Sequence, residues 1–286
     1  MTNFNELFTN NTETVFLYDQ HCLTEKDYYL PFALTDTLTT FAGINTQPII
    51  HFWQLDQAMI LGMKDTRVDD LKSGLNALKE DGYNSVIRNA GGLGVIADAG
   101  VLNVSLILPN EGNKKISIDE AYTYMWDWIK CAFEDTNHSI NAFEVTESYC
   151  PGTFDLSING KKFAGIAQRR VKDGTAIMIY LSVTGDQQRR GKSVRRFYET
   201  SLHENFGKNG YPPVNPSVMA NLEDLLQKKM TINEVKKRLI SVLLDNMSIS
   251  IDEQIVPKLL TSDWFETEIN KQTDKMHQRN LLLKQL

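Results

Sequence analysis

Residues 88–103 read RNAGGLGVIADAGVLN and place Gly91, Gly92 and Gly94 between two expected strands. Glycine lets a backbone approach a ligand closely and leaves its N–H groups exposed as donors. A turn between two strands would use the same residues. The stretch therefore predicts either a tight turn or a loop that binds a ligand.

The next informative stretch is SYCPGTFD at residues 148–155. Cys150 precedes Pro-Gly in a loop that leads into an expected strand, and functional residues collect on such loops. A lone thiol can equally be a small buried core residue. Cys22 and Cys131 lie outside this motif, and Cys131 falls within an expected helix. Cys150 is therefore the candidate nucleophile, with a structural thiol as the alternative.

A hairpin is predicted directly after the cysteine loop. Asn159-Gly160 suits the positive φ angles of a type I′ turn, and its return strand opens with Lys161 and Lys162. Gly165 within that strand suggests close approach by a ligand or by backbone. The hairpin can bring a lysine back to the cysteine loop; a solvated basic strand end is the alternative.

The remaining elements favour an α+β fold. Ser117 and Glu120 form a capping-box signature before an aromatic-rich helix. Helices and hairpins are interspersed without a regular βαβ rhythm. Expected helices cover residues 27–41, 68–81, 117–135 and 193–203, and expected strands cover residues 48–53, 58–61, 85–88, 101–108, 154–158 and 175–183.

The character of the sequence changes near residue 210. Pro212, Pro213 and Pro216 interrupt the chain, and residues 218–286 read mainly as helices. We expect a main domain at 1–210 and a helical C-terminal extension at 211–286 that packs on the same domain. A linker to a separate unit is the alternative.

Composition excludes several classes of protein. A chain of 286 residues with 42% hydrophobic residues can bury a sizeable core. Its net charge of −6 argues against nucleic-acid binding. Three widely spaced cysteines and five histidines show no metal-ligand spacing, so no metal is expected. We also expect no membrane span, no signal peptide and a cytoplasmic location.

One apparent nucleotide motif is rejected. Gly191-Lys192-Ser193 is similar to the end of a phosphate-binding loop, but Asp186 stands where that loop requires its first glycine.

The two blocks together resemble the lipoate–biotin protein ligase superfamily over roughly residues 25 to 205. That pattern is an arginine, a glycine-rich segment and an aspartate, followed by Lys-x-x-Gly-x-Ala. The resemblance implies an α+β fold with a mixed, largely antiparallel sheet flanked by helices. The residues that match are Arg88, Gly91, Gly92, Gly94, Asp98, Asn103, Lys162, Gly165 and Ala167. Apart from Lys162 and Asn103, these are the expected substrate-binding residues.

A narrower resemblance rests on Tyr149-Cys150-Pro151-Gly152 and on residues 160–165 and 179–181. They are similar to the octanoyl-[H protein]:protein N-octanoyltransferases of low-GC Gram-positive bacteria. The resemblance implies transfer of octanoyl from the glycine cleavage H protein to lipoyl domains of 2-oxoacid dehydrogenase acyltransferase subunits, without a cofactor. Ala97 departs from the histidine that many superfamily members carry there.

The resemblance also implies roles for two catalytic residues. Cys150 would form an octanoyl thioester, which divides one difficult amide exchange into two steps. Lys162 would be the cationic partner that favours the thiolate and exchanges protons with the two amines. Backbone N–H groups of residues 91–94 or 150–152 would stabilise the oxyanion.

Three alternatives stay open. They are an octanoyltransferase that uses octanoyl-acyl carrier protein, an ATP-dependent lipoate–protein ligase, and an inactive module that binds lipoyl domains. A basic cluster is either a docking surface for acidic carrier domains or a solvated helix face; its members are Arg189, Arg190, Lys192, Arg195 and Arg196.

Overall fold

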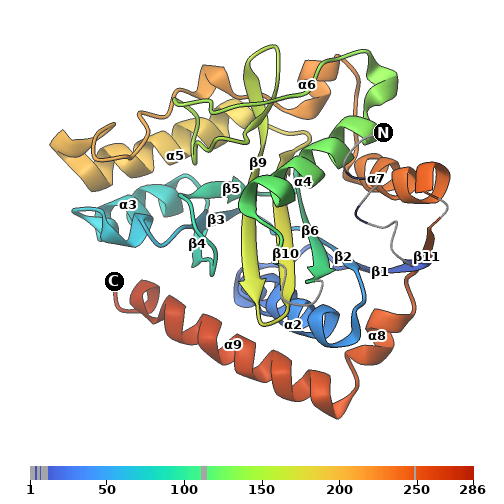
Figure 1. Ribbon diagram of the computed structural model, residues 1–286. Coiled ribbons are helices and arrows are strands. Elements are labelled where there is room, and N and C mark those ends of the chain that lie inside the picture. Colours follow the sequence, from blue (N-terminus) through green and yellow to red (C-terminus); the bar gives the residue numbers. More distant parts are fainter. Residues whose placement is uncertain (1–3, 5–6, 8–11, 111–114, 248) are drawn as a thin grey trace.

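The larger of two sheets has eight strands in the computed structural model, which describes residues 4, 7, 12–110, 115–247 and 249–286 (Figure 1). The strand order is β11-β1-β2-β6-β10-β9-β8-β7. β1 is parallel to both of its neighbours, and every pairing from β2 to β7 is antiparallel. The expected mixed, largely antiparallel sheet is thus confirmed. The strands are β1 Thr14–Asp19, β2 Ile49–Trp53, β6 Val101–Pro109, β7 Asn141–Ala142, β8 Leu156–Ile158, β9 Lys161–Val171, β10 Gly174–Ser182 and β11 Ser250–Asp252.

The smaller sheet carries the glycine-rich stretch. It has three strands in the order β4-β3-β5, with β3 parallel to β4 and antiparallel to β5. Residues 88–94 connect β4 to β5, so the glycines lie at the end of this sheet. The strands are β3 Ala58–Leu61, β4 Asn84–Ile87 and β5 Val95–Ala97.

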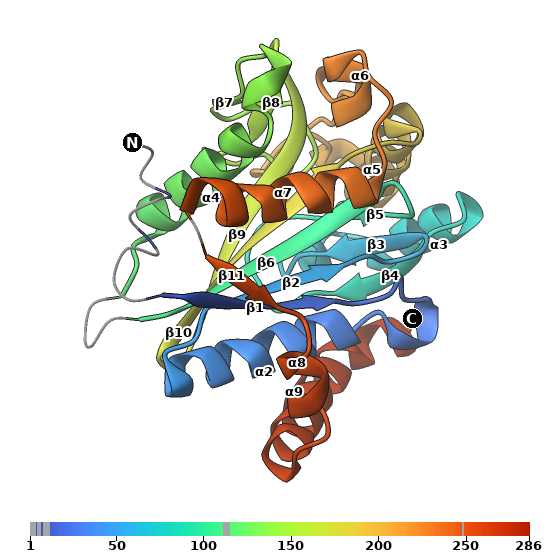
Figure 2. The same cartoon turned by 90° about the vertical axis from the view of Figure 1, so that its right-hand side faces the viewer.

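Helices cover both faces of the large sheet (Figure 2). α4 and α7 lie on one face, and α2 with α9 on the other, while α3 and α5 pack together beside the small sheet. The α-helices are α2 Leu30–Asn45, α3 Leu71–Glu80, α4 Ile118–Ala132, α5 Gln187–Leu202, α6 Leu222–Leu226, α7 Ile232–Met247, α8 Ile255–Leu259 and α9 Asp263–Lys284. Short 3-10 turns span Glu25–Asp27, Asp65–Arg67, Glu134–Thr136, His203–Asn205 and Pro216–Val218.

Local sequence signals are confirmed where they were strong. The capping box forms, because the Ser117 hydroxyl accepts from the Glu120 N–H and the Glu120 carboxylate accepts from the Ser117 N–H. The hairpin turn has φ of 51° at Asn159 and 76° at Gly160, as a type I′ turn requires. Gly191 lies inside α5, which begins at residue 187 rather than 193, so no phosphate loop is present there.

One element of the C-terminal extension differs from the expected helices. β11 pairs in parallel with β1, and the Thr14 and Ser250 hydroxyls lie 2.7 Å apart. β11 is three residues long and none of them is buried, so its sequence has no apolar pattern to predict a strand. The pairing with β1 at the opposite end of the chain makes it one.

The face between α2 and the large sheet contains a buried histidine. His51 in β2 is fully buried, with its Nδ1 3.2 Å from the Thr35 hydroxyl and its Nε2 3.0 Å from Gln20 Oε1. Burial lowers the pKa of His51 from 6.5 to about 3. The folded protein therefore holds this ring neutral at pH values where the unfolded chain would protonate it.

We predict that His51 makes stability fall with acid. Between pH 6.5 and about 3 the unfolded chain binds a proton at His51 that the folded chain excludes, so the stability present above 6.5 is lost as pH falls. His51→Gln should lose less stability than the wild type between about pH 7 and about pH 4.5, by on the order of 2 kcal/mol. Urea unfolding at both pH values measures it; equal losses in the two proteins would contradict it.

Candidate active site

Cys150 lies in the loop between β7 and β8, with its side chain partly buried. Its φ is 47°, a left-handed conformation that is uncommon for residues other than glycine. Its sulfur faces the glycine-rich stretch, because the Leu93 N–H donates to Sγ at 3.2 Å. The thiol thus meets a backbone donor from the small sheet while its own loop belongs to the large one.

Lys162 holds the cysteine loop from below. It lies near the start of β9 and is 3% exposed, whereas Lys161 is exposed, so the two lysines point to opposite sides as their adjacency in a strand predicts. Its ammonium lies 2.7 Å from the Cys150 carbonyl oxygen, 3.0 Å from the Tyr149 carbonyl oxygen and 3.2 Å from the Ser148 hydroxyl. The hairpin therefore does bring Lys162 to the loop, but onto its carbonyl groups rather than onto the sulfur.

Asp155 completes this clamp. Its Oδ1 lies 2.9 Å from the Lys162 ammonium, and its Oδ2 accepts from the N–H groups of Val145 at 3.1 Å and Gly152 at 3.2 Å. Asp155 is 2% exposed, and this burial raises the pKa of its carboxyl although Lys162 opposes the shift. The buried ion pair therefore joins both ends of the cysteine loop to β9.

Arg88 supplies the cation closest to the sulfur in the described structure. Its Nη2 donates to the carbonyl oxygens of Gly91 at 2.6 Å and Leu93 at 3.0 Å, and lies 3.7 Å from Cys150 Sγ. The sequence analysis assigned the cationic partner role to Lys162 and a substrate-binding role to Arg88. The geometry instead points the guanidinium at the thiol and the ammonium at the loop backbone.

Two of the glycines are required by close approach. A Cβ on Gly92 would lie 2.5 Å from Arg88 Nη2 and 3.1 Å from Cys150 Sγ, and Gly92 also has a φ of 93°. A Cβ on Gly94 would lie 2.2 Å from Met59 Cε. Gly91 is exposed and has open space around it, so its position imposes no such requirement.

The second family block borders the Lys162 ammonium. A Cβ on Gly165 would lie 3.7 Å from Lys162 Nζ and 3.9 Å from Asp155 Oδ1. Ala167 follows two residues later in β9 and is partly buried. These small residues leave room over the ion pair, consistent with the expected approach of a ligand at Gly165.

Asp98 does not join the sulfur. It pairs with Arg190, whose Nε donates to Asp98 Oδ2 at 2.8 Å and which is 1% exposed. Arg190 also donates to the Ser182 hydroxyl at 2.9 Å and contacts Gln187, which donates to the Tyr149 hydroxyl at 2.9 Å. Asp98 therefore reaches the neighbour of Cys150 through a buried network. Sequence reasoning missed this network, because Arg190 has no sequence signal that separates it from its exposed neighbours.

The basic cluster is largely neutralised within the protein. Arg195 pairs with Glu199 at 2.7 Å, and Arg196 pairs with Asp81 at 2.7 Å and also with Glu80. With Arg190 buried against Asp98, little of the cluster is available to an acidic partner. The solvated-face interpretation therefore fits these contacts better than the docking interpretation.

A second missed contact braces the glycine-rich stretch. Arg169 of β9 donates to Asp36 Oδ2 at 2.7 Å and to the Asn89 carbonyl oxygen at 2.6 Å, and Asp36 is 3% exposed in α2. A lone carboxylate within an apolar helical run was a visible signal for a buried polar partner.

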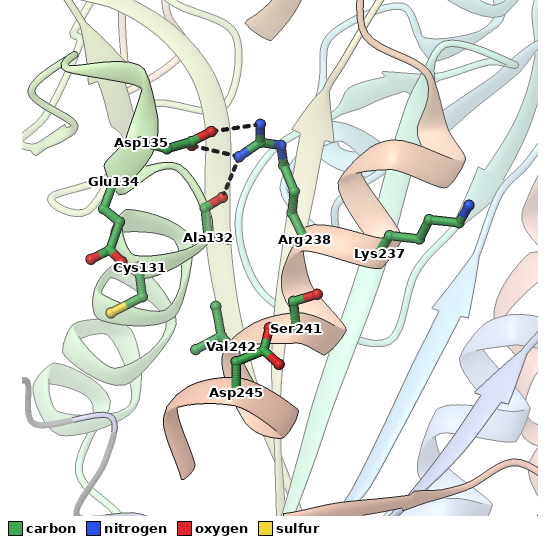
Figure 3. Close-up of a pocket in the computed structure, with 9 residues that line it drawn as sticks. All are labelled: Cys131, Ala132, Glu134, Asp135, Lys237, Arg238, Ser241, Val242 and Asp245. Carbon is green, nitrogen blue, oxygen red and sulfur yellow. Dashed lines mark hydrogen bonds and ion pairs between the residues drawn. The ribbon is translucent and has the colours of Figure 1, made fainter. Parts of the chain in front are cut away.

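A surface hollow lies apart from this site, between the end of α4 and α7 (Figure 3). An ion pair spans it, with Arg238 donating to Asp135 at 2.6 and 3.0 Å, and Cys131 lies on its α4 side. The hollow shares no lining residue with the Cys150 site, so we do not assign it to the acyl group.

Two absences apply to the described residues only. Over those ranges, no group of three or more histidine, cysteine, aspartate or glutamate side chains is placed to hold a metal ion. Within the same part of the chain, every helix is too short or too polar to cross a bilayer. All three cysteines are free of disulfide bonds.

Comparison with known proteins gives a consistent result. The family model described as lipoyl protein ligase A/B catalytic domain matches residues 27–244. An octanoyl-[GcvH]:protein N-octanoyltransferase from Staphylococcus aureus is 44% identical over 216 residues, which cover 75% of this chain and 77% of that protein. A lipoyl-[GcvH]:protein N-lipoyltransferase from Listeria monocytogenes is 42% identical over 213 residues, 74% of this chain and 76% of that protein. Among solved structures, lipoate-protein ligase A bound with ATP superposes with a TM-score of 0.68 at 19% identity, covering 92% of this chain and 95% of that one, and so shares the fold.

We predict that the Lys162–Asp155 pair is required for stability. Lys162→Met should lower the free energy of unfolding by on the order of 3 kcal/mol, because it leaves Asp155 buried without its cation. Lys161→Met, the matched exposed control, should leave it nearly unchanged. Adding Asp155→Asn to Lys162→Met should recover part of the loss. Denaturant titration measures all three, and a larger loss for Lys161→Met would contradict the assignment.

Proposed function

The chain belongs to the lipoyl protein ligase A/B catalytic-domain family and is an acyltransferase, and we propose that it moves an octanoyl group between lysines of carrier proteins. The donor is a lysine of the glycine cleavage H protein, and the acceptors are lysines of lipoyl domains of 2-oxoacid dehydrogenase acyltransferase subunits. One observation supports this most directly: Cys150 Sγ faces the Leu93 N–H and the Arg88 guanidinium in a loop held by a buried ion pair.

In the first step, the Cys150 thiolate attacks the carbonyl carbon of the octanoyl-lysine amide. A C–S bond forms, the carbonyl oxygen becomes an oxyanion, and the C–N bond then breaks as the departing amine takes up a proton. The Arg88 guanidinium and the Leu93 N–H lie where they stabilise negative charge at the sulfur before attack.

In the second step, the amine of an acceptor lysine attacks the thioester and loses a proton. The C–S bond breaks and the thiolate is restored. Lys162 remains our proposed proton carrier for the two amines, and Gly165 leaves room beside its ammonium. In the structure this ammonium is engaged by loop carbonyls, so Lys162 also positions the nucleophile.

This proposal differs from its alternatives in energy source and donor. An ATP-dependent ligase would activate a free acid with nucleotide, whereas exchange between two lysine amides is nearly isoenergetic and needs none. An octanoyl-acyl carrier protein donor would supply a thioester, a better electrophile than an amide. The relatives are named for transfer from GcvH, which favours the amide donor. Because one relative is named a lipoyltransferase, lipoyl is a second candidate acyl group. We place the reaction in the cytoplasm, where the three free thiols stay reduced.

We predict that Cys150→Ala abolishes transfer, whereas Cys22→Ala and Cys131→Ala retain it. The enzyme is mixed with octanoyl-H protein and an apo lipoyl domain without nucleotide, and intact-mass spectrometry follows both the acylated enzyme and the acylated lipoyl domain. Full transfer by Cys150→Ala would exclude the covalent mechanism. Labelling from octanoyl-acyl carrier protein with none from octanoyl-H protein would favour the thioester-dependent alternative.

We predict a separate defect for Arg88→Gln. Loss of the guanidinium removes the cation at the sulfur, so the rate of thioester formation should fall by about ten- to a hundredfold. Single-turnover acylation followed by mass spectrometry measures this rate. An unchanged rate accompanied by a large loss of thermal stability would instead assign Arg88 to structure alone.

A further inference from the structure

The end of α9 contacts the small sheet directly beside the site. In Figure 1 the red helix crosses beneath the large sheet and its C-terminal end lies near β4 and α3. Asn280 lies in these last turns and is 9% exposed. Its amide oxygen accepts from the Ile87 N–H at 2.7 Å, and its Nδ2 donates to the Ile87 carbonyl oxygen at 3.1 Å.

These two hydrogen bonds satisfy a strand edge. β4 is an edge strand of the small sheet, and Ile87 is 1% exposed. Backbone groups that are buried at an edge need partners other than water. The Asn280 side chain provides both partners at one residue, as a neighbouring strand would, and its Nδ2 also donates to the Met276 carbonyl oxygen within α9 at 2.9 Å.

Ile87 is followed directly by Arg88. On the opposite side of β4, the Arg88 N–H donates to the Leu61 carbonyl oxygen of β3 at 2.9 Å. The backbone that carries the guanidinium is therefore fixed by β3 on one side and by α9 on the other. From this position the guanidinium reaches Cys150 Sγ at 3.7 Å.

We propose that Asn280 is a positioning residue for Arg88, so that the C-terminal helix takes part in setting the geometry at the thiol. The family match ends at residue 244, before α9 begins, so this support comes from a segment outside the matched catalytic domain. The proposal rests on the proposed function only in that Cys150 is the nucleophile.

The contact can be removed without detaching the helix. Met276 is 2% exposed in the core that also contains Leu93 and Tyr149, and the His277 ring lies 4.4 Å from the Tyr29 ring. Gln272 offers a matched control, because it is a buried amide on the same helix whose hydrogen bonds go to Glu268 and Lys275 of α9.

The test compares Asn280→Ala, Asn280→Asp and Gln272→Ala in the full chain. Amide hydrogen exchange reports on Ile87, peptide-resolved iodoacetamide labelling reports on Cys150, and steady-state octanoyl transfer gives kcat and KM. Asn280→Ala should speed exchange at Ile87, slow Cys150 labelling and lower kcat by about tenfold with KM for the carrier unchanged. Asn280→Asp keeps the acceptor for the Ile87 N–H and should fall between Asn280→Ala and the wild type.

Gln272→Ala should change none of these readouts, even where it lowers the melting temperature as much as Asn280→Ala does. Wild-type labelling and kcat in Asn280→Ala would overturn the proposal while leaving the acyltransferase function intact. If the wild type transfers no octanoyl group but Asn280→Ala still slows Cys150 labelling, the positioning role stands and the proposed function fails.

Discussion

The buried ion pair between Lys162 and Asp155 is the interaction on which the cysteine loop depends. It lies almost wholly out of water, and each partner uses its remaining hydrogen-bonding capacity on the loop backbone. Such a pair is stable only when those additional hydrogen bonds are present. It also holds Cys150 at a positive φ, a conformation that a residue other than glycine keeps only when its surroundings fix it. The thiol is therefore directed by a charge pair that never touches the sulfur.

Parts of this site were predictable because they follow short-range rules. Asn159-Gly160 sets the turn by its own φ preferences, and strand alternation makes Lys162 rather than Lys161 the buried lysine. The capping box at Ser117 is fixed within one helical turn. The family pattern supplied the sheet, which no local rule gives. Each of these predictions needed only neighbouring residues or a known pattern.

The rest could not be predicted, because it depends on contacts between distant residues. Which cation meets the sulfur is decided by how the small sheet abuts the large one, and the sequence has no marker for it. Arg190 resembles its exposed neighbours in sequence, yet it is buried because Asp98 and Ser182 converge on it. Asn280 reaches Ile87 across almost two hundred positions, and only the packing of α9 brings them together.

The thiol lies where the two sheets meet. The large sheet supplies Cys150 and its clamp through β8 and β9, while the small sheet supplies the Leu93 N–H and the Arg88 guanidinium. A shift of one sheet against the other would separate the donors from the sulfur without breaking any bond within either sheet. Contacts that cross between them, such as Arg169 to the Asn89 carbonyl oxygen, therefore matter more to the thiol than their distance from it suggests. A fold shared with an ATP-bound ligase does not determine the chemistry. What favours covalent acyl transfer here is a cysteine held at that junction and faced by donors from the opposite sheet.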